Sequence, residues 1–285
     1  MMLEFKGKNV LITGAAMGIG RSLSRHFARD GANLALVDLP QEKDRLESWA
    51  NELHAAYGIN TWTFYGDLTA PHGPEKLYED VMKTVGDIHT LVNNAGTAWY
   101  GIFREMPPEM LERMILLNCM AYVKLTRLFL PAMVEKDEGG VLNLASGAAF
   151  QPLPTLSLYA GTKAFTQSFT ESIRLELPRK SKVVISTLNP PFTRTPLIEH
   201  GGFPPDYIPK VLCYLDVDDM TEAGYRAFKK GKIRFVPGVR NKLLHLVIVK
   251  YLPHDAVNFL ARILTHNLSD FLPGFLVKPI VKWRS

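Results

Sequence analysis

The segment NVLITGAAMGIG, residues 9–20, decides the fold of this chain. Its first five residues form a short, β-branched run typical of a buried strand, and its glycines stand where a helical segment begins. Such a turn lets a pyrophosphate approach the backbone, and the helix N-terminus supplies free N–H groups and a positive dipole end. The spacing is G-xxx-G-x-G, and glycines also mark ordinary strand-to-helix turns, so the signal needs support from elsewhere. The residues that we expect to bind a dinucleotide here are Gly14, Met17, Gly18, Ile19 and Gly20.

Strands and helical segments alternate along the rest of the chain. Further strands are predicted at 33–37, 61–65, 88–93, 140–145, 182–187 and 233–236. Helical periodicity covers 18–30, 41–57, 73–85, 107–136, 157–177 and 219–230. This alternation predicts an α/β fold, a doubly wound (Rossmann) seven-stranded parallel sheet with helices on both faces. We assign residues 1–237 to one domain, with a substrate loop at about 190–217, and residues 238–285 to a helical C-terminal extension.

The composition is that of a globular protein, with 47% hydrophobic and 21% charged residues in a chain of 285. The first residues show no secretory signal, so we expect a cytoplasmic location. Cys119 and Cys213 are too few for a disulfide framework or a cysteine-based zinc site, and no metal site is predicted. Residues 229–285 hold eleven Lys and Arg against two Asp, but no nucleic-acid-binding motif accompanies them. We therefore predict no nucleic-acid partner.

An acidic residue ends the second predicted strand. Asp38 lies 18 residues after Gly20, where a carboxylate can hydrogen-bond the adenosine ribose hydroxyls and repel a 2′-phosphate. Met17 places no cation in the glycine turn, which favours NAD over NADP, although Arg21 could attract the phosphate. The alternative is that Asp38 is a turn residue before Pro40.

The ends of the third and fourth predicted strands carry further candidates for the cofactor site. Asp67, followed by Leu68, could accept a hydrogen bond from an adenine amino group or could cap the next helix. Asn94, Ala95 and Gly96 come at the end of the fourth strand, where small residues let the backbone lie close to a ribose.

Tyr159 and Lys163 lie four residues apart in a predicted helix, so both project from one face. A neighbouring ammonium favours the ionised phenol, which would make Tyr159 a usable proton donor or acceptor. Ser146 is predicted at the carboxyl end of the fifth strand, where its hydroxyl could hold a substrate oxygen. Taken alone, such a pair is more often a packed tyrosine and a solvated lysine. The conjunction with the glycine turn and the strand ends favours a catalytic site.

Together these motifs, TGAAMGIG, NNAG, Ser146 and YAGTK, resemble those of the short-chain dehydrogenase/reductase family over about residues 5–237. The resemblance implies that Tyr159 is the catalytic acid/base, that Ser146 orients the substrate, and that Lys163 binds the nicotinamide ribose and lowers the pKa of the tyrosine. It also implies that Asn118 holds a water molecule that links the lysine to solvent. Without the resemblance, Asn118 would be interpreted as a helix-interior residue bonded to backbone.

The segment NPPFTRT, residues 189–195, resembles the family's P-G-xxx-T segment, in which the threonine helps to hold the nicotinamide carboxamide. Pro191 replaces the glycine, so the local backbone path is expected to differ. The residues that this resemblance adds to the cofactor site are Pro190, Thr193 and Thr195.

We therefore expect an NAD(H)-dependent oxidoreductase that interconverts a carbonyl and a secondary alcohol. The substrate loop is mostly apolar, which favours a hydrophobic, lipid-like or sterol-like ketone or alcohol contacting Ser146, Phe150, Tyr159 and Leu197. One alternative is a non-catalytic dinucleotide sensor or scaffold on the same fold, but such a protein need not keep the catalytic set. Another is lyase or epimerase chemistry on a nucleotide sugar, which the lack of an obvious extra domain disfavours.

The extension, residues 238–285, is basic and apolar. Its apolar segments 243–252, 256–264 and 271–281 are each shorter than the roughly 18 residues that a membrane-spanning helix needs. Three placements remain open for it, namely a peripheral membrane surface, a second subunit or the entrance of the active site. The family resemblance also implies a homodimer or homotetramer formed through residues 107–136 and 157–177.

Overall fold

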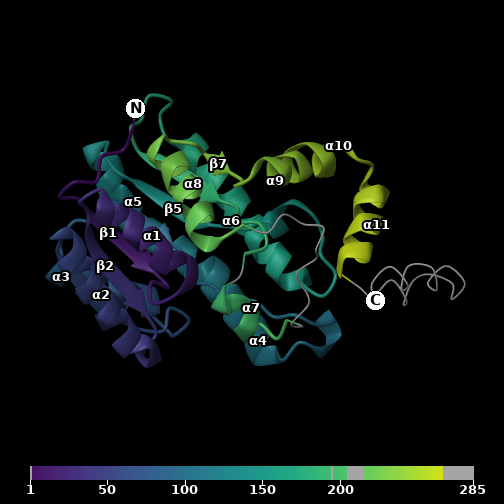
Figure 1. Cartoon of the computed structure of the whole chain (residues 1–285), viewed down its shortest axis with the longest axis horizontal. Helices are drawn as coiled ribbons and strands as arrows, with labels where there is room; N and C mark the ends of the chain where they lie inside the picture. Colours follow the sequence, from purple (N-terminus) through teal and green to yellow (C-terminus); the bar gives the residue numbers. More distant parts are fainter. Residues whose placement is uncertain (1, 194, 204–214, 266–285) are drawn as a thin grey trace, which may run out of the picture.

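The structure is a computed structural model that describes residues 2–193, 195–203 and 215–265. Seven parallel strands form one sheet in the order β3-β2-β1-β4-β5-β6-β7 (Figure 1). The order reverses between β1 and β4, which is the switch point where doubly wound sheets bind ligands. The predicted doubly wound fold is confirmed. The strands are β1 (Asn9–Thr13), β2 (Asn33–Asp38), β3 (Thr61–Tyr65), β4 (Thr90–Asn93), β5 (Gly140–Leu144), β6 (Val184–Leu188) and β7 (Arg234–Phe235).

The major helices cover both faces of the sheet. Alternate strand residues point to opposite faces, so Val10 and Ile12 enter one apolar core and Leu11 enters the other. The first core is closed by α1 (Gly18–Arg29), α2 (Lys43–Tyr57) and α8 (Val217–Lys229). The second core is closed by α3 (Gly73–Thr84), α5 (Ala121–Lys136) and α6 (Ser157–Glu176). Short 3-10 turns connect some elements at Pro40–Glu42, Phe103–Glu105 and Gly147–Phe150.

The helical segment predicted at 107–136 has a break in its hydrogen-bond pattern. It consists of α4 (Pro108–Ile115), a π-helical turn (Leu116–Met120) and α5. Within the described residues, only this stretch is long and apolar enough to span a membrane by length and composition. Its buried residues, among them Leu125 and Phe129, pack against the sheet in the second core. Core helices of soluble proteins pass the same test, so its apolar character is explained by this packing.

The described part of the extension is helical. It contains α9 (Val239–Leu243), a π-helical turn (Leu244–Ile248), α10 (Val249–Tyr251) and α11 (His254–Thr265), all beyond the last strand (Figure 1). The substrate loop contributes α7 (Pro196–His200). Cys213 and part of the predicted loop lie outside the described residues, as does the end of the extension.

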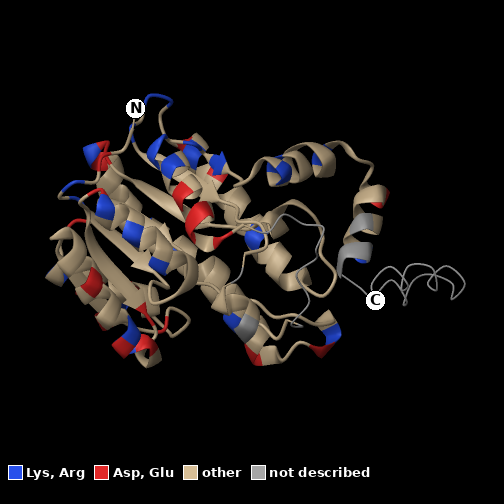
Figure 2. Cartoon of the chain, in the orientation of Figure 1, with Lys and Arg blue, Asp and Glu red and all other residues tan. Residues whose placement is uncertain are grey.

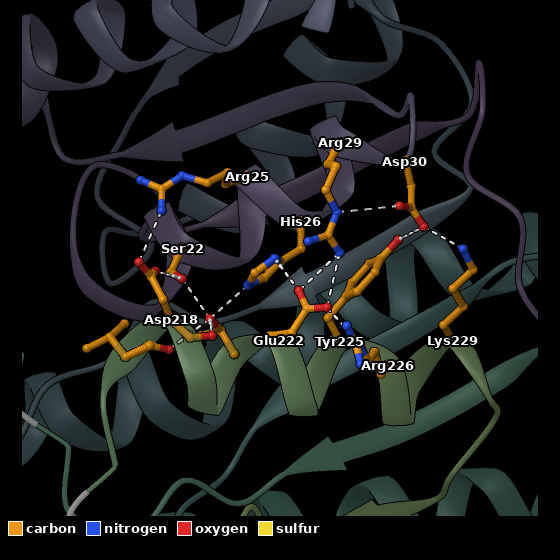
Figure 3. Close-up of polar contacts among 12 residues, drawn as sticks. Ser22, Arg25, His26, Arg29, Asp30, Asp218, Glu222, Tyr225, Arg226 and Lys229 are labelled. Atoms are coloured by element: carbon orange, nitrogen blue, oxygen red, sulfur yellow. Dashed lines mark hydrogen bonds and ion pairs between the residues drawn. The ribbon is translucent and has the colours of Figure 1, made fainter. Parts of the chain in front are cut away.

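A polar network joins α1 to α8 across the outer side of the first core (Figure 3). Ser22 and His26 on α1 meet Asp218, Thr221 and Glu222 on α8. The imidazole Nε2 lies 3.0 Å from the Thr221 hydroxyl, and Nδ1 lies 2.8 Å from a Glu222 carboxylate oxygen. Both ring nitrogens of this buried histidine are therefore paired, which removes the penalty for burying them. Further along, Tyr225 and Lys229 both bond Asp30.

Candidate active site

One cavity of about 900 Å³ opens at the carboxyl ends of the parallel strands. It is lined by loops that follow β1, β2, β3, β4, β5 and β6, and by parts of α6, α7 and the extension. This is the position that the strand-order reversal predicts for a ligand. Most residues that the sequence assigned to the cofactor line it: Gly14, Met17, Gly18, Ile19, Asp38, Asp67, Leu68, Asn94, Ala95, Gly96, Tyr159, Lys163, Pro190, Thr193 and Thr195.

The glycine turn depends on close backbone contacts. Gly14 and Gly18 have positive φ angles of 65° and 55°, which L side chains rarely adopt. Gly20 does not line the cavity, and a Cβ there would overlap the carbonyl oxygen of Gly14. Its role is therefore to let α1 pack against the turn. Asn94 Nδ2 donates to the carbonyl oxygens of Thr13 and Gly14, at 2.8 and 3.0 Å, and so ties the loop after β4 to this turn.

Asp38 has both carboxylate oxygens engaged by backbone. Oδ2 accepts from the Ala16 N–H at 2.8 Å and Oδ1 from the Leu39 N–H at 2.9 Å. Burial raises the pKa of this carboxyl, and the two backbone hydrogen bonds oppose the rise. Arg21, which the sequence left as a candidate for a 2′-phosphate, stacks on Trp49, with its guanidinium carbon 4.1 Å from the ring centroid.

Asp67 caps a local turn and not a helix. Its Oδ1 accepts from the N–H and the hydroxyl of Thr69, and Oδ2 lies 3.2 Å from the Arg113 guanidinium. Helix α3 begins later, at Gly73. The helix-cap alternative for Asp67 is wrong because the chain makes a separate turn before that helix begins. The adenine interpretation stays a prediction, supported by the place of Asp67 in the cavity wall.

Tyr159, Ser146 and Lys163 meet in the cavity wall. Burial raises the pKa of the Tyr159 phenol, and the Ser146 hydroxyl works against that rise. The Lys163 ammonium donates to the Leu144 carbonyl at 2.8 Å and lies 5.7 Å from the Tyr159 ring centroid. Burial lowers the pKa of Lys163 to about 8, because a desolvated ammonium is costly.

The pKa of Tyr159 differs from the family-based expectation. The resemblance implied that Lys163 lowers this pKa. In this structure burial raises the pKa of Tyr159, and the group that partly opposes the rise is Ser146. The physical reason is burial of the phenol, which disfavours the phenolate, while the ammonium is directed to the Leu144 carbonyl. Tyr159 therefore keeps its proton at neutral pH.

Asn118 lies in the π-helical turn, fully buried, behind the cavity wall. Its amide exchanges two hydrogen bonds with the backbone of Thr97, both at 2.9 Å, and donates to the Thr162 hydroxyl at 3.1 Å. The backbone-bonded interpretation is what the structure shows for this side chain. π-Helical turns occur frequently at functional sites, and here the turn fixes the loop after β4 to helix α6.

Of the predicted substrate residues, Leu197 lines the cavity and Phe150 does not. Its ring stacks on His245 of the extension, with centroids 5.0 Å apart and planes 21° apart, so a substrate contact by Phe150 stays a prediction. Phe203 and Leu153 add apolar surface to the same wall. Phe150 therefore packs against His245, which lines the cavity.

The sequence did not assign two parts of the cavity lining, namely Arg113 and the residues of the extension. Arg113 of α4 lies at the Asp67 side. Among the three placements left open for the extension, the structure puts its described part against the active site. The sequence signal that could have indicated this placement is the pair Asn241 and His245, which lie four residues apart in an otherwise apolar segment. The cavity residues of the extension are Arg240, Asn241, Leu244, His245, Ile248, Val249, Leu252, Val257 and Ala261.

Comparison with known proteins identifies the family. The family model for short chain dehydrogenases matches residues 8–201, and the chain belongs to the short-chain dehydrogenase/reductase family, a family of oxidoreductases. A very-long-chain 3-oxoacyl-CoA reductase from Bos taurus is 30% identical over 188 residues, 64% of this chain and 58% of that protein. Short-chain dehydrogenase/reductase family 16C member 6 from Bos taurus is 33% identical over 198 residues, 69% of this chain and 62% of that protein. The chain thus spans less than two thirds of these relatives.

A solved structure supports the same assignment. The short-chain dehydrogenase from Sphingobium yanoikuyae in complex with NADPH is 28% identical, with a TM-score of 0.76. The match covers 94% of this chain and 97% of that one. A nicotinamide dinucleotide therefore fits the cavity that the glycine turn, Asp38 and Lys163 line.

Proposed function

We propose that this chain is an NAD(H)-dependent oxidoreductase that interconverts a carbonyl and a secondary alcohol on a hydrophobic substrate. The observation that carries the proposal is that Tyr159, Ser146 and Lys163 share one cavity with the glycine turn. The cavity walls beyond Tyr159 are largely apolar, from Leu153 to Ile248, which suits a lipid-like substrate. The long-chain acyl specificity in the bovine relative's name is consistent with such a cavity.

In the proposed mechanism, a bound nicotinamide would supply or accept the hydride, and the residues of this chain would orient the substrate oxygen and transfer its proton. Tyr159 holds a proton at neutral pH because burial raises its pKa, and this is the form that can protonate a carbonyl oxygen. Ser146 lines the same cavity as Tyr159, and its hydroxyl can donate to the same substrate oxygen. Lys163 would bind the nicotinamide ribose, and its ammonium would stabilise the phenolate left by proton transfer.

The test of this mechanism is Tyr159→Phe. Turnover of medium-chain and long-chain ketones, followed at the NADH absorbance, should fall at least about a thousandfold, since general acid catalysis contributes roughly that much. The NADH dissociation constant should change less than about threefold, because the phenol hydroxyl alone is removed. Full activity in this variant would reject the mechanism. A wild-type protein that binds NADH but turns over no carbonyl or alcohol would instead favour the non-catalytic alternative.

We also propose that NAD is preferred over NADP. The adenosine end of the cavity carries the carboxylate of Asp38 and that of Glu42, which is paired with Arg45, and Arg21 is held against Trp49 and Glu52. A 2′-phosphate would meet negative charge there. The Sphingobium yanoikuyae relative binds NADPH, so the preference rests on this chain's own residues. Fluorescence titration should show tighter binding of NADH than of NADPH, and Asp38→Ser should reduce the ratio about tenfold. Tighter NADPH binding by the wild type would reject the preference.

For location, we propose a cytoplasmic protein that touches a membrane surface through the extension. Val239, Leu243, Val247 and Tyr251 recur every fourth residue and are all exposed, and Lys and Arg flank them (Figure 2). An apolar stripe with basic neighbours suits an anionic lipid surface. The double variant Val247→Glu with Tyr251→Glu should lose flotation with anionic liposomes, while Leu175→Glu, on exposed α6 surface, should keep it. Equal flotation of all three proteins, or none by the wild type, would reject the membrane contact.

The expected homodimer or homotetramer is also proposed. Met120 and Phe165 are large, exposed and located on the helical segments that the family resemblance assigns to subunit contacts. Light scattering at micromolar concentration should give a dimer or tetramer mass, and Phe165→Glu should shift it towards the monomer. A monomeric wild type would reject the proposal.

A further inference from the structure

Three residues bring the extension into contact with the catalytic loop. His245 lies in the π-helical turn of the extension and lines the cavity, and only 7% of it is exposed. Its ring stacks on Phe150. A Cβ at Gly147 would lie 2.9 Å from the imidazole Nε2, so a glycine beside Ser146 lets the ring approach the backbone closely. The imidazole is therefore held next to the loop that carries a catalytic hydroxyl.

One nitrogen of this buried imidazole lacks the partner that such a group normally has. Nδ1 has no hydrogen-bond partner within the described ranges. Burial lowers the pKa of His245 to about 4, so the ring is neutral at physiological pH, with one N–H and one lone pair. Buried polar groups are normally satisfied, and an unsatisfied one in a cavity wall can be satisfied by a ligand that enters the cavity. Gln151, in the same wall, also has a buried side-chain oxygen without a partner among the described residues.

Among the described residues, no carboxylate perturbs the pKa of this ring. The cavity cations nearest in sequence are Arg240 on α9 and Lys163 on α6, and the carboxylates of the lining, Asp38, Glu42 and Asp67, belong to the adenosine end. Burial is the single cause of the low pKa of His245. A neutral imidazole of this kind recognises an uncharged oxygen, either by donating to a carbonyl or by accepting from a hydroxyl.

We infer that His245 and Gln151 form a second polar subsite that binds a substrate oxygen other than the reacting one, as in the thioester carbonyl of a 3-oxoacyl substrate. This inference rests on the proposed function and specifies its substrate class. Tyr159 and Ser146 take the oxygen that is reduced, and His245 holds the neighbouring carbonyl. The extension is then part of substrate selection, because it supplies His245, one of the two hydrogen-bonding side chains of this subsite.

The experiment compares two substrates of equal chain length. One is a medium-chain 3-oxoacyl N-acetylcysteamine thioester, and the other is the simple ketone without the thioester. His245→Phe keeps an aromatic ring to stack on Phe150 and removes both nitrogens. Its kcat/KM for the 3-oxoacyl thioester should fall about tenfold more than its kcat/KM for the ketone, because a buried polar partner is left unpaired. His245→Gln, which keeps a donor, should recover most of the loss.

The control is His254→Phe, which makes the same change at an exposed histidine outside the cavity. It should leave the kcat/KM ratio for the two substrates within about twofold of the wild-type ratio. An equal loss on both substrates in His245→Phe, or no recovery in His245→Gln, would overturn the subsite and leave His245 as a packing residue. A wild type that reduces neither substrate would reject the proposed function itself, which is a different result from an active wild type with insensitive variants.

Discussion

Two histidines of this chain are buried almost equally, at 6% exposed for His26 and 7% for His245, yet they occupy opposite kinds of environment. Both nitrogens of His26 are paired, with Thr221 and Glu222, inside the network between α1 and α8 (Figure 3). Nδ1 of His245 has no partner in the described part of the chain, and its ring faces a cavity. Burial lowers the pKa of both. The pKa direction alone therefore does not separate these two histidines, which differ in that Nδ1 of His26 is paired with Glu222 whereas Nδ1 of His245 lacks a partner among the described residues.

The same contrast extends to the charged side chains of the two regions. In the network, Arg25 and Arg29 are paired with Asp218 and Glu222. In the cavity, the buried ammonium of Lys163 has a single backbone acceptor. We expect the paired charges between α1 and α8 to stabilise the packing of these two helices. We expect the incompletely bonded groups of the cavity to bind a ligand. Mutations in the two regions should therefore separate stability from activity.

Among the variants that test this contrast between the two regions, the largest effect is expected from Lys163→Met. The kcat/KM for ketone reduction should fall at least about a hundredfold, because Tyr159 loses the cation that would stabilise its phenolate. The free energy of unfolding should not fall, since Met replaces a buried ammonium that has one hydrogen bond. NADH absorbance and urea denaturation measure the two quantities. Lys230→Met, at an exposed position of the same residue type, is the control. A large loss of stability would place Lys163 with the structural groups and weaken the comparison.

The second effect lies on the network side. Glu222→Leu removes the partner of His26, Arg29 and Arg226 in one step. The side chain is 21% exposed, so the expected loss is about 2 kcal/mol, below the 3–5 kcal/mol typical of a fully buried pair. Urea denaturation measures it.

Its control is Glu176→Leu, at an exposed position of α6. Turnover of both variants, measured well below their unfolding temperatures, should stay within about twofold of wild type. If Glu222→Leu costs no more stability than Glu176→Leu, the network does not hold α1 to α8.

The smallest expected effect is on the pH dependence of the free energy of unfolding, to which His245 contributes. The pKa of His245 is near 6.5 in the unfolded chain and about 4 in the folded one. Between these values the unfolded state binds more protons, so the free energy of unfolding falls as pH falls from about 6.5 towards 4. His245→Gln should reduce that fall by about 1 kcal/mol between pH 6 and pH 5, measured by urea denaturation. Identical pH profiles for the variant and the wild type would show that His245 is not buried as described.

The parts that could be predicted from the sequence are those with a local signal. The strand at 9–13 and the glycine turn follow from β-branched runs and from backbone positions that need glycine, and Tyr159 and Lys163 share a helix face by spacing alone. Ser146 and the cofactor loops follow because all parallel strands end at one edge of the sheet. These inferences need no knowledge of how distant segments pack.

The remaining features depend on tertiary packing. Phe150 looked like a substrate residue because its loop follows Ser146, but His245 covers its ring. Nothing local ties residue 245 to Gly147, and the helix that carries it could equally have faced a membrane or a second subunit. The raised pKa of Tyr159 depends likewise on how deeply the phenol is buried, which only the folded chain determines.

The position of the last cavity wall also bears on how the protein is made. Residues 9–235 contain every strand of the sheet and the glycine turn, and residues 240–261 complete the substrate side. A ribosome adds about 5–20 residues each second, so the sheet is synthesised before its final wall. The dinucleotide half of the cavity can therefore form on a nascent chain that does not yet have a closed substrate half. During synthesis, the order in which the two ligands could first bind would be set by the direction of translation.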